Sequence, residues 1–259
     1  MLALASWSPP PICGVLTDID DTLTHQGHIE PEALQALADL KAAGLMVIAI
    51  TGRPVGWSEP FAQAWPVDAI VAENGAVALQ RSANSLVKTY QQDAATRAEN
   101  FARMQAALQK IEQGIQGAKR SQDSSGRETD IAIDHSEFTR LSPETIAQVV
   151  GMMQSHGLHA TVSSIHINAW YGEHNKLQGA RWVLRTLFAR DLDAELAQWV
   201  YVGDSTNDQL MFAHLPHSVG VANVQDFAAQ LTHLPRYVTQ RPRGQGFAEL
   251  AQHLLKARA

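Results

Sequence analysis

The stretch Asp18-Ile19-Asp20-Asp21-Thr22 most constrains what this chain can fold into, because it directly follows an apolar run at residues 12–16. Such a run predicts a buried strand, and Asp18 and Asp20 then stand near its carboxyl end, where open α/β sheets bind ligands. Two anions this close together need a cation or a proton between them. A second acidic cluster, residues 203–208, follows another apolar run at 199–202. Oxygen ligands from two strand ends indicate a hard cation, most simply Mg²⁺.

The alternation of patterns along the chain predicts an α/β fold with a doubly wound parallel sheet. Beside the two strands above, apolar runs at 45–50, 68–72 and 217–221 predict strands. Helical patterns cover 31–43, 56–64, a stretch from His174, a short stretch after Asp208, and 247–256.

The pattern changes near Arg81, where a separate α/β block begins. It contains a predicted helix at 94–113, a polar loop at 114–127, a strand at 129–133, a helix at 142–156, and strands at 158–163 and 165–170. We therefore expect a core built from residues 1–80 and 173–259, with an inserted domain at 81–172.

Composition excludes some classes of function. The net charge of −6 argues against nucleic acid or an anionic membrane as the main partner. No apolar run approaches the roughly 20 residues that span a bilayer, and the first residues do not resemble a secretory signal. The single cysteine, Cys13, rules out an intramolecular disulfide. We expect a cytoplasmic protein, a monomer or small homo-oligomer.

Four motifs occur in an order that resembles the haloacid dehalogenase (HAD) superfamily of phosphotransferases. They are Asp18-x-Asp20-x-Thr22, Thr51 in Ile-Thr-Gly-Arg, Lys176, and Gly203-Asp204-x-x-Asn207-Asp208. The resemblance covers residues 12–80 and 173–259 and implies a Rossmann-like HAD core that uses Mg²⁺. The lysine motif departs from many relatives, in which glycine follows the lysine directly, whereas here Gly179 comes three residues later.

The resemblance also implies roles for the motif residues. Asp18 would be the nucleophile that forms an aspartyl-phosphate, and Asp20 the general acid and then base, for which a raised pKa is expected. Thr51, Gly52, Arg53 and Lys176 would bind the phosphate; Asp18, Asp20 (through its carbonyl) and Asp204 would hold Mg²⁺; Thr22, Asn207 and Asp208 would support them. Alternatives remain open: a surface salt bridge for Arg53, a solvent-exposed lysine for Lys176, and helix capping for Asn207 and Asp208.

The position of the insert, between Thr51 and Lys176, resembles HAD type IIB, whose members include sugar-phosphate phosphatases, Cof-type phosphatases and phosphomannomutase. Such an α/β cap would select the leaving group of a small phosphorylated metabolite. The expected strand at 165–170 alternates, so His166, Asn168 and Trp170 share one face that suits a sugar ring. An ordinary cap sheet face is the alternative. No Lys or Arg lies on this strand, which favours a neutral sugar or polyol monophosphate.

The main prediction is thus a Mg²⁺-dependent phosphomonoester hydrolase. A phosphosugar mutase keeps the same chemistry with a different acceptor. A non-catalytic sensor of a phosphorylated ligand is a third reading, although the chain keeps both Asp18 and Asp20.

Overall fold

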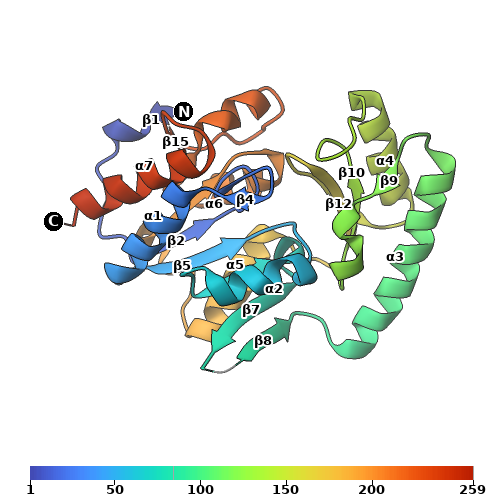
Figure 1. Ribbon diagram of the computed structural model, residues 1–259, viewed down its shortest axis with the longest axis horizontal. Coiled ribbons are helices and arrows are strands. Elements are labelled where there is room, and N and C mark those ends of the chain that lie inside the picture. Colours follow the sequence, from blue (N-terminus) through green and yellow to red (C-terminus); the bar gives the residue numbers. More distant parts are fainter. Residues whose placement is uncertain (84, 259) are drawn as a thin grey trace.

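The apolar runs of the sequence form the centre of a nine-stranded sheet in the computed structural model, which describes residues 1–83 and 85–258 (Figure 1). The strand order is β1-β15-β14-β13-β2-β5-β6-β7-β8. Pairs from β1 to β6 are parallel, and only β7 and β8 run antiparallel to their neighbours. The predicted doubly wound α/β fold is confirmed. The strands are β1 (Leu2–Ala3), β2 (Gly14–Thr17), β5 (Met46–Ile50), β6 (Ala69–Ala72), β7 (Val77–Ser82), β8 (Ser85–Tyr90), β13 (Trp199–Gly203), β14 (Ser218–Gly220) and β15 (Tyr237–Val238).

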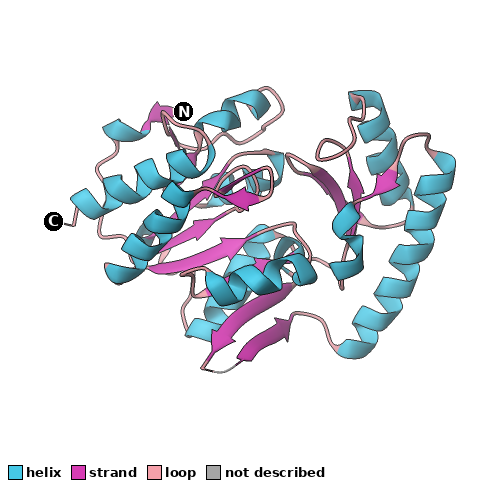
Figure 2. Cartoon of the chain, viewed as in Figure 1, coloured by secondary structure: helices cyan, strands magenta, loops and turns pink. Residues whose placement is uncertain are grey.

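Helices cover both faces of this sheet, as Figure 2 shows in cyan. On one face, α1 (Pro31–Ala42), α2 (Val55–Ala64) and α7 (Arg243–Lys256) bury side chains such as Leu37 and Phe247. On the other face, α5 (Lys176–Phe188) and α6 (Gln209–His214) bury Val183 and Phe212. The apolar faces of the helices are buried against the two faces of the sheet, and this burial holds the helices in place. The sheet therefore lies between two separate hydrophobic cores.

A smaller α/β unit, residues 94–170, lies beside the large sheet (green to yellow in Figure 1). Its antiparallel sheet has the order β11-β12-β10-β9 and is packed against α3 (Ala94–Gly114) and α4 (Pro143–Ser155). The strands are β9 (Lys119–Arg120), β10 (Ile131–Asp134), β11 (His159–Val162) and β12 (His166–Trp170). A core of its own, including Met104, Ile133 and Ile167, holds this small unit together.

Two strands at residues 77–90 have no counterpart in the sequence prediction. β7 and β8 form a hairpin at the edge of the large sheet, so β8 lies on the core side although it follows the expected boundary at 81. The side chains of β8 are exposed or half-buried and show no regular alternation, which is why periodicity gave no signal. The division of the chain into domains stays a prediction.

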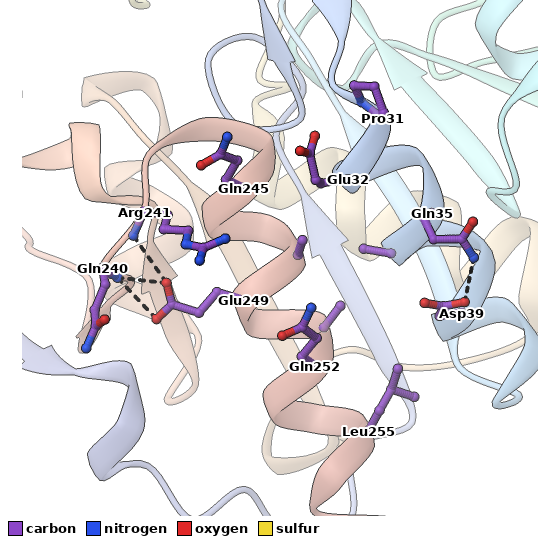
Figure 3. A pocket seen from close by; sticks show the side chains of 13 residues that line it. Pro31, Glu32, Gln35, Asp39, Gln240, Arg241, Gln245, Glu249, Gln252 and Leu255 are labelled. Atoms are coloured by element: carbon purple, nitrogen blue, oxygen red, sulfur yellow. Dashed lines mark hydrogen bonds between the residues drawn. The ribbon is translucent and has the colours of Figure 1, made fainter.

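Two further surface features frame the large sheet. A short antiparallel flap, β3 (Thr24–His25) and β4 (His28–Ile29), follows the first acidic motif. A groove of about 800 Å³ runs between α1 and α7, lined among others by Gln35, Glu249 and Gln252 (Figure 3). No helix in the described part of the chain combines the length and the apolar character needed to cross a membrane.

Helix α5 is set against the large sheet by a close approach of two glycines. A β-carbon on Gly179, in α5, would lie 2.5 Å from the Cα atom of Gly75. Gly75 itself has φ +111°, and its own β-carbon would collide with the carbonyl oxygen of Asn175. Since neither position has room for a methyl group, Gly179 fixes how near the start of α5 comes to the end of β6.

We predict that Gly179→Ala lowers the free energy of unfolding by about 1–3 kcal/mol, because the added methyl group meets backbone atoms that cannot yield. The matched control is Gly151→Ala in α4, an exposed glycine at which an added β-carbon would have no atom within 4 Å. There the better helix propensity of alanine should stabilise the protein by about 0.5–1 kcal/mol. Urea unfolding measures both, and equal effects of the two substitutions would contradict the close packing.

Candidate active site

The predicted site residues follow neighbouring parallel strands at one edge of the large sheet. Asp18 follows β2, Thr51 follows β5, and Asp204 follows β13, and all three are buried. The carboxyl ends of parallel strands meet at one edge, so strand order alone brings these side chains together.

Lys176 lies in the middle of this edge. It is the first residue of α5, whose start is capped by the Asn175 side chain. Its ammonium nitrogen lies 2.8 Å from Asp18 Oδ1 and 2.7 Å from Asp208 Oδ1. With 3% of its surface exposed, it is not a solvent-exposed lysine. Although burial disfavours its charge, the carboxylates of Asp18 and Asp208 raise its pKa above the usual value. Gly179, the first glycine after Lys176, packs α5 against the large sheet, as described above.

Asp208 organises the cluster. One of its oxygens accepts hydrogen bonds from Lys176 and from the hydroxyl of Tyr201, and the other accepts from the backbone N–H groups of Asp204 and Ser205. Together with Ser205 it also forms a capping box at the short 3₁₀ helix Thr206–Asp208. The two alternatives for Asp208, helix capping and orientation of Lys176, therefore describe one arrangement.

The residues present fit a divalent cation. Asp18, Asp204 and Asp208 each offer an oxygen within 4.8 Å of the others. Asp208 already accepts from four donors, whereas Asp204 Oδ1 is buried and meets no donor among residues 1–83 and 85–258. Burial and then the neighbouring carboxylates raise the pKa of Asp18 to about 8 and that of Asp204 well above its usual value. Crowded anions with an unsatisfied oxygen suit an oxygen-liganded hard cation such as Mg²⁺, with Asp18 and Asp204 as its ligands.

Asp20 faces a different partner. Its carboxylate lies 2.9 Å from Nε of Arg53, which also contacts Asp123 and Glu137 of the small unit at 3.2 Å and 2.7 Å. Arg53 is thus in a salt bridge, but a buried one at the site, not the surface pair considered from the sequence. The expected role of Asp20 as general acid and then base stays a prediction.

The remaining motif residues have local partners. The Thr51 hydroxyl accepts from the backbone N–H of Arg53, and the Ser205 hydroxyl donates to Asn207. The Thr22 hydroxyl is buried, with no partner in the described residues. Their assigned roles stay predictions.

The three residues expected to share one face of β12 have different neighbours. Asn168 donates to the carbonyl of Gly52 in the core, and His166 lies 2.9 Å from Glu137, which itself contacts Arg53. Trp170 instead stacks on the imidazole of His174, with ring centres 5.2 Å apart, and donates to the His174 carbonyl. The three residues do not gather around one ring-sized space in this arrangement, and their contact with substrate stays a prediction.

Several side chains of the small unit surround Gly52; of these, the sequence pointed to the loop that contains Arg127, without its geometry. Arg127 donates to the Gly52 carbonyl at 3.0 Å, and Asp130 accepts from both Arg127 and Asn168. Asp123 and Glu137 contact Arg53 as above. A polar loop at 114–127 was predicted, but its approach to the core depends on how the small unit sits, which no local pattern encodes.

A pocket of about 440 Å³ opens beside Asp20. It is lined by Asp20, Arg53 and Arg243, by residues 21 and 24–27 in and before the flap, and by the small unit (Ser136, Glu137, Phe138, Ile165). The groove between α1 and α7 is larger, but no predicted site residue lines it. The smaller pocket is the one that adjoins the acidic cluster.

Comparison with known proteins agrees with this geometry. The model of the haloacid dehalogenase-like hydrolase family matches residues 15–116. A search of curated protein sequences finds no significant match. Three solved structures resemble the chain over nearly its whole length: a protein of Thermoplasma acidophilum (17% identity, 94% of this chain and 98% of that one, TM-score 0.72), the sucrose-phosphatase of Synechocystis sp. PCC6803 in complex with sucrose and phosphate (18%, 94% and 98%, 0.67), and a sugar phosphatase of HAD subclass IIB (16%, 93% and 98%, 0.61).

The chain is similar to the haloacid dehalogenase-like hydrolases, whose family model matches residues 15–116. Its fold, with an α/β unit inserted after the second motif, is that of type IIB. The predicted fold is confirmed, and the predictions of this family and of a hydrolytic enzyme agree with the family model over residues 15–116 and with the similar phosphatase structures.

We predict that Asp208→Asn lowers the free energy of unfolding by about 3 kcal/mol, because an amide cannot accept from all four donors and leaves Lys176 facing a neutral group. Asp226→Asn, the same substitution at an exposed aspartate, is the control and should change it by less than about 0.5 kcal/mol. Chemical denaturation measures both. A small effect at Asp208, comparable to that at Asp226, would show that the cluster does not depend on it.

Proposed function

We propose that the protein is a Mg²⁺-dependent phosphomonoesterase that acts on a sugar or polyol monophosphate through an aspartyl-phosphate on Asp18. The observation that carries the proposal is the buried contact of Asp18 with Lys176, beside the donor-free oxygen of Asp204. A nucleophilic carboxylate, a fixed positive charge and a cation-binding oxygen are what transfer of a phosphoryl group requires.

Each chain residue has a defined task in this proposal. Asp18 attacks phosphorus and takes the phosphoryl group, while the bond to the leaving oxygen breaks. Lys176, held by Asp208, offsets charge on the transferred group, and the Thr51 hydroxyl and nearby N–H groups bind its oxygens. Asp20 donates a proton to the leaving oxygen and then removes one from the water that cleaves the aspartyl-phosphate. Mg²⁺, held by Asp18 and Asp204, would supply charge neutralisation at the phosphate oxygens.

The pocket beside Asp20 supports a neutral leaving group. Asp20, Asp21 and Glu137 outnumber Arg53 and Arg243 on its lining, and both arginines already contact these acids. A second phosphate would therefore meet more carboxylates than arginines, and arginines that are already paired, whereas hydroxyl groups find acceptors and donors together. The similarity to a sucrose-phosphatase and a sugar phosphatase supports the same class of substrate. In this proposal the small unit acts as the cap that covers the leaving group.

The test is phosphate release from a panel of sugar, polyol and nucleotide monophosphates with Mg²⁺. We expect one group of sugar or polyol phosphates to be hydrolysed well above the others, and activity to vanish with chelator and return with added Mg²⁺. Asp18→Asn, which keeps the shape of the side chain, should lower release by about 10³-fold or more.

The control for that substitution is Asp226→Asn, which should leave release unchanged, with circular dichroism confirming the fold of both variants. Substantial release by Asp18→Asn, or full activity in excess chelator, would contradict the proposal. Isomerised hexose phosphate in place of free phosphate would indicate a mutase, and tight binding of a sugar phosphate without turnover would indicate a sensor.

A further inference from the structure

Glu73 is a buried carboxylate that the proposed chemistry does not use. It follows β6 in the 3₁₀ turn Glu73–Gly75, with left-handed backbone (φ 50°) and none of its surface exposed. In the described part of the chain it makes no salt bridge. N–H and O–H donors, together with the nearby charge of Arg127, must therefore offset the cost of burying it.

These donors come from two different parts of the molecule. On the core side, the backbone N–H of Val55, the first residue of α2, donates to Glu73 at 3.0 Å. On the side of the small unit, the backbone N–H of Glu128 donates at 2.9 Å, and Thr129 donates through both its N–H and its hydroxyl. Most of the donors that solvate Glu73 thus belong to the small unit.

The same core loop receives the other contacts of the small unit. Arg127 and Asn168 donate to the Gly52 carbonyl, and Gly126 packs so closely on Gly56 that a β-carbon on Gly56 would lie 2.9 Å from its Cα atom. This loop, residues 52–56, carries Arg53, which contacts Asp20. Any change in how the small unit sits therefore reaches Asp20 through these few residues.

We propose that Glu73 is a positioning residue that holds residues 127–129 of the small unit against the loop 52–56 and so keeps Arg53 at Asp20. Lifting the small unit would replace the Glu128 and Thr129 donors of Glu73 by water, and hydrogen bonds of a charged group to fixed protein donors are favourable over that exchange. Glu73 thus favours the arrangement in which the small unit contacts residues 52–56. The catalytic part of this inference rests on the proposed phosphatase function, whereas its structural part does not.

Glu73→Gln tests the proposal, because the amide nitrogen turns a donor toward the donors of the small unit. Hydrogen exchange should quicken at least about tenfold in peptides covering Glu128 and Thr129, since a lost hydrogen bond to a charged group exceeds one factor of ten. The control is Glu32→Gln in α1, an exposed glutamate of the large unit, which should leave exchange there unchanged.

Steady-state kinetics distinguishes a positioning role from a general loss of stability, because a general loss would affect all substrates alike. KM for the sugar phosphate best hydrolysed in the panel should rise about tenfold in Glu73→Gln, while kcat/KM for p-nitrophenyl phosphate, too small to need the cap, should change less than about threefold. Thr129→Val should act in the same direction and Thr129→Ser, which keeps the hydroxyl, should restore KM. These two variants also test the proposal if Glu73→Gln does not fold.

Unchanged exchange at Glu128 and Thr129, or equal losses for both substrates, would overturn the role of Glu73. Exchange does not depend on turnover. Faster exchange in a protein that releases no phosphate would therefore support the positioning role while contradicting the proposed function.

Discussion

The site depends on one buried ammonium group shared by two carboxylates. Lys176 lies within 2.8 Å of Asp18 and of Asp208, and Asp204 stands beside them with an oxygen that no donor of the described residues reaches. Ion pairs are costly to bury unless their geometry is well fixed. Here Tyr201, the capping box at residues 205–208 and the glycine contact at Gly179 supply that fixed geometry.

The second constraint is the packing of the small unit against the loop that follows β5. Gly52 accepts from Arg127 and Asn168, and Arg53 reaches both Asp20 and two acids of the small unit. The same loop therefore joins the residues proposed to bind phosphate to the part of the chain proposed to cover the leaving group. In the family's chemistry, this coupling would let closure exclude water before transfer begins.

The five central strands of the sheet and the acidic edge were predicted from local pattern, whereas the outer strands β1, β7, β8 and β15 were not. Apolar runs locate β2, β5 and β13, and polar residues directly after them must meet once the strands are parallel. The contacts of Arg53, Glu73 and Arg127 were beyond reach, since each joins segments far apart in the chain through the docking of one unit on another. Trp170 illustrates the same limit: alternation gives its face, but not its stacking on His174.

The most direct test of the account is to trap the intermediate on Asp18. The protein is mixed with its best substrate and Mg²⁺, quenched with acid and reduced with borohydride, which converts an aspartyl-phosphate to homoserine. Peptide mass spectrometry should find homoserine at position 18 and not at position 20. Conversion at another aspartate, or none during rapid turnover, would contradict Asp18 as the nucleophile.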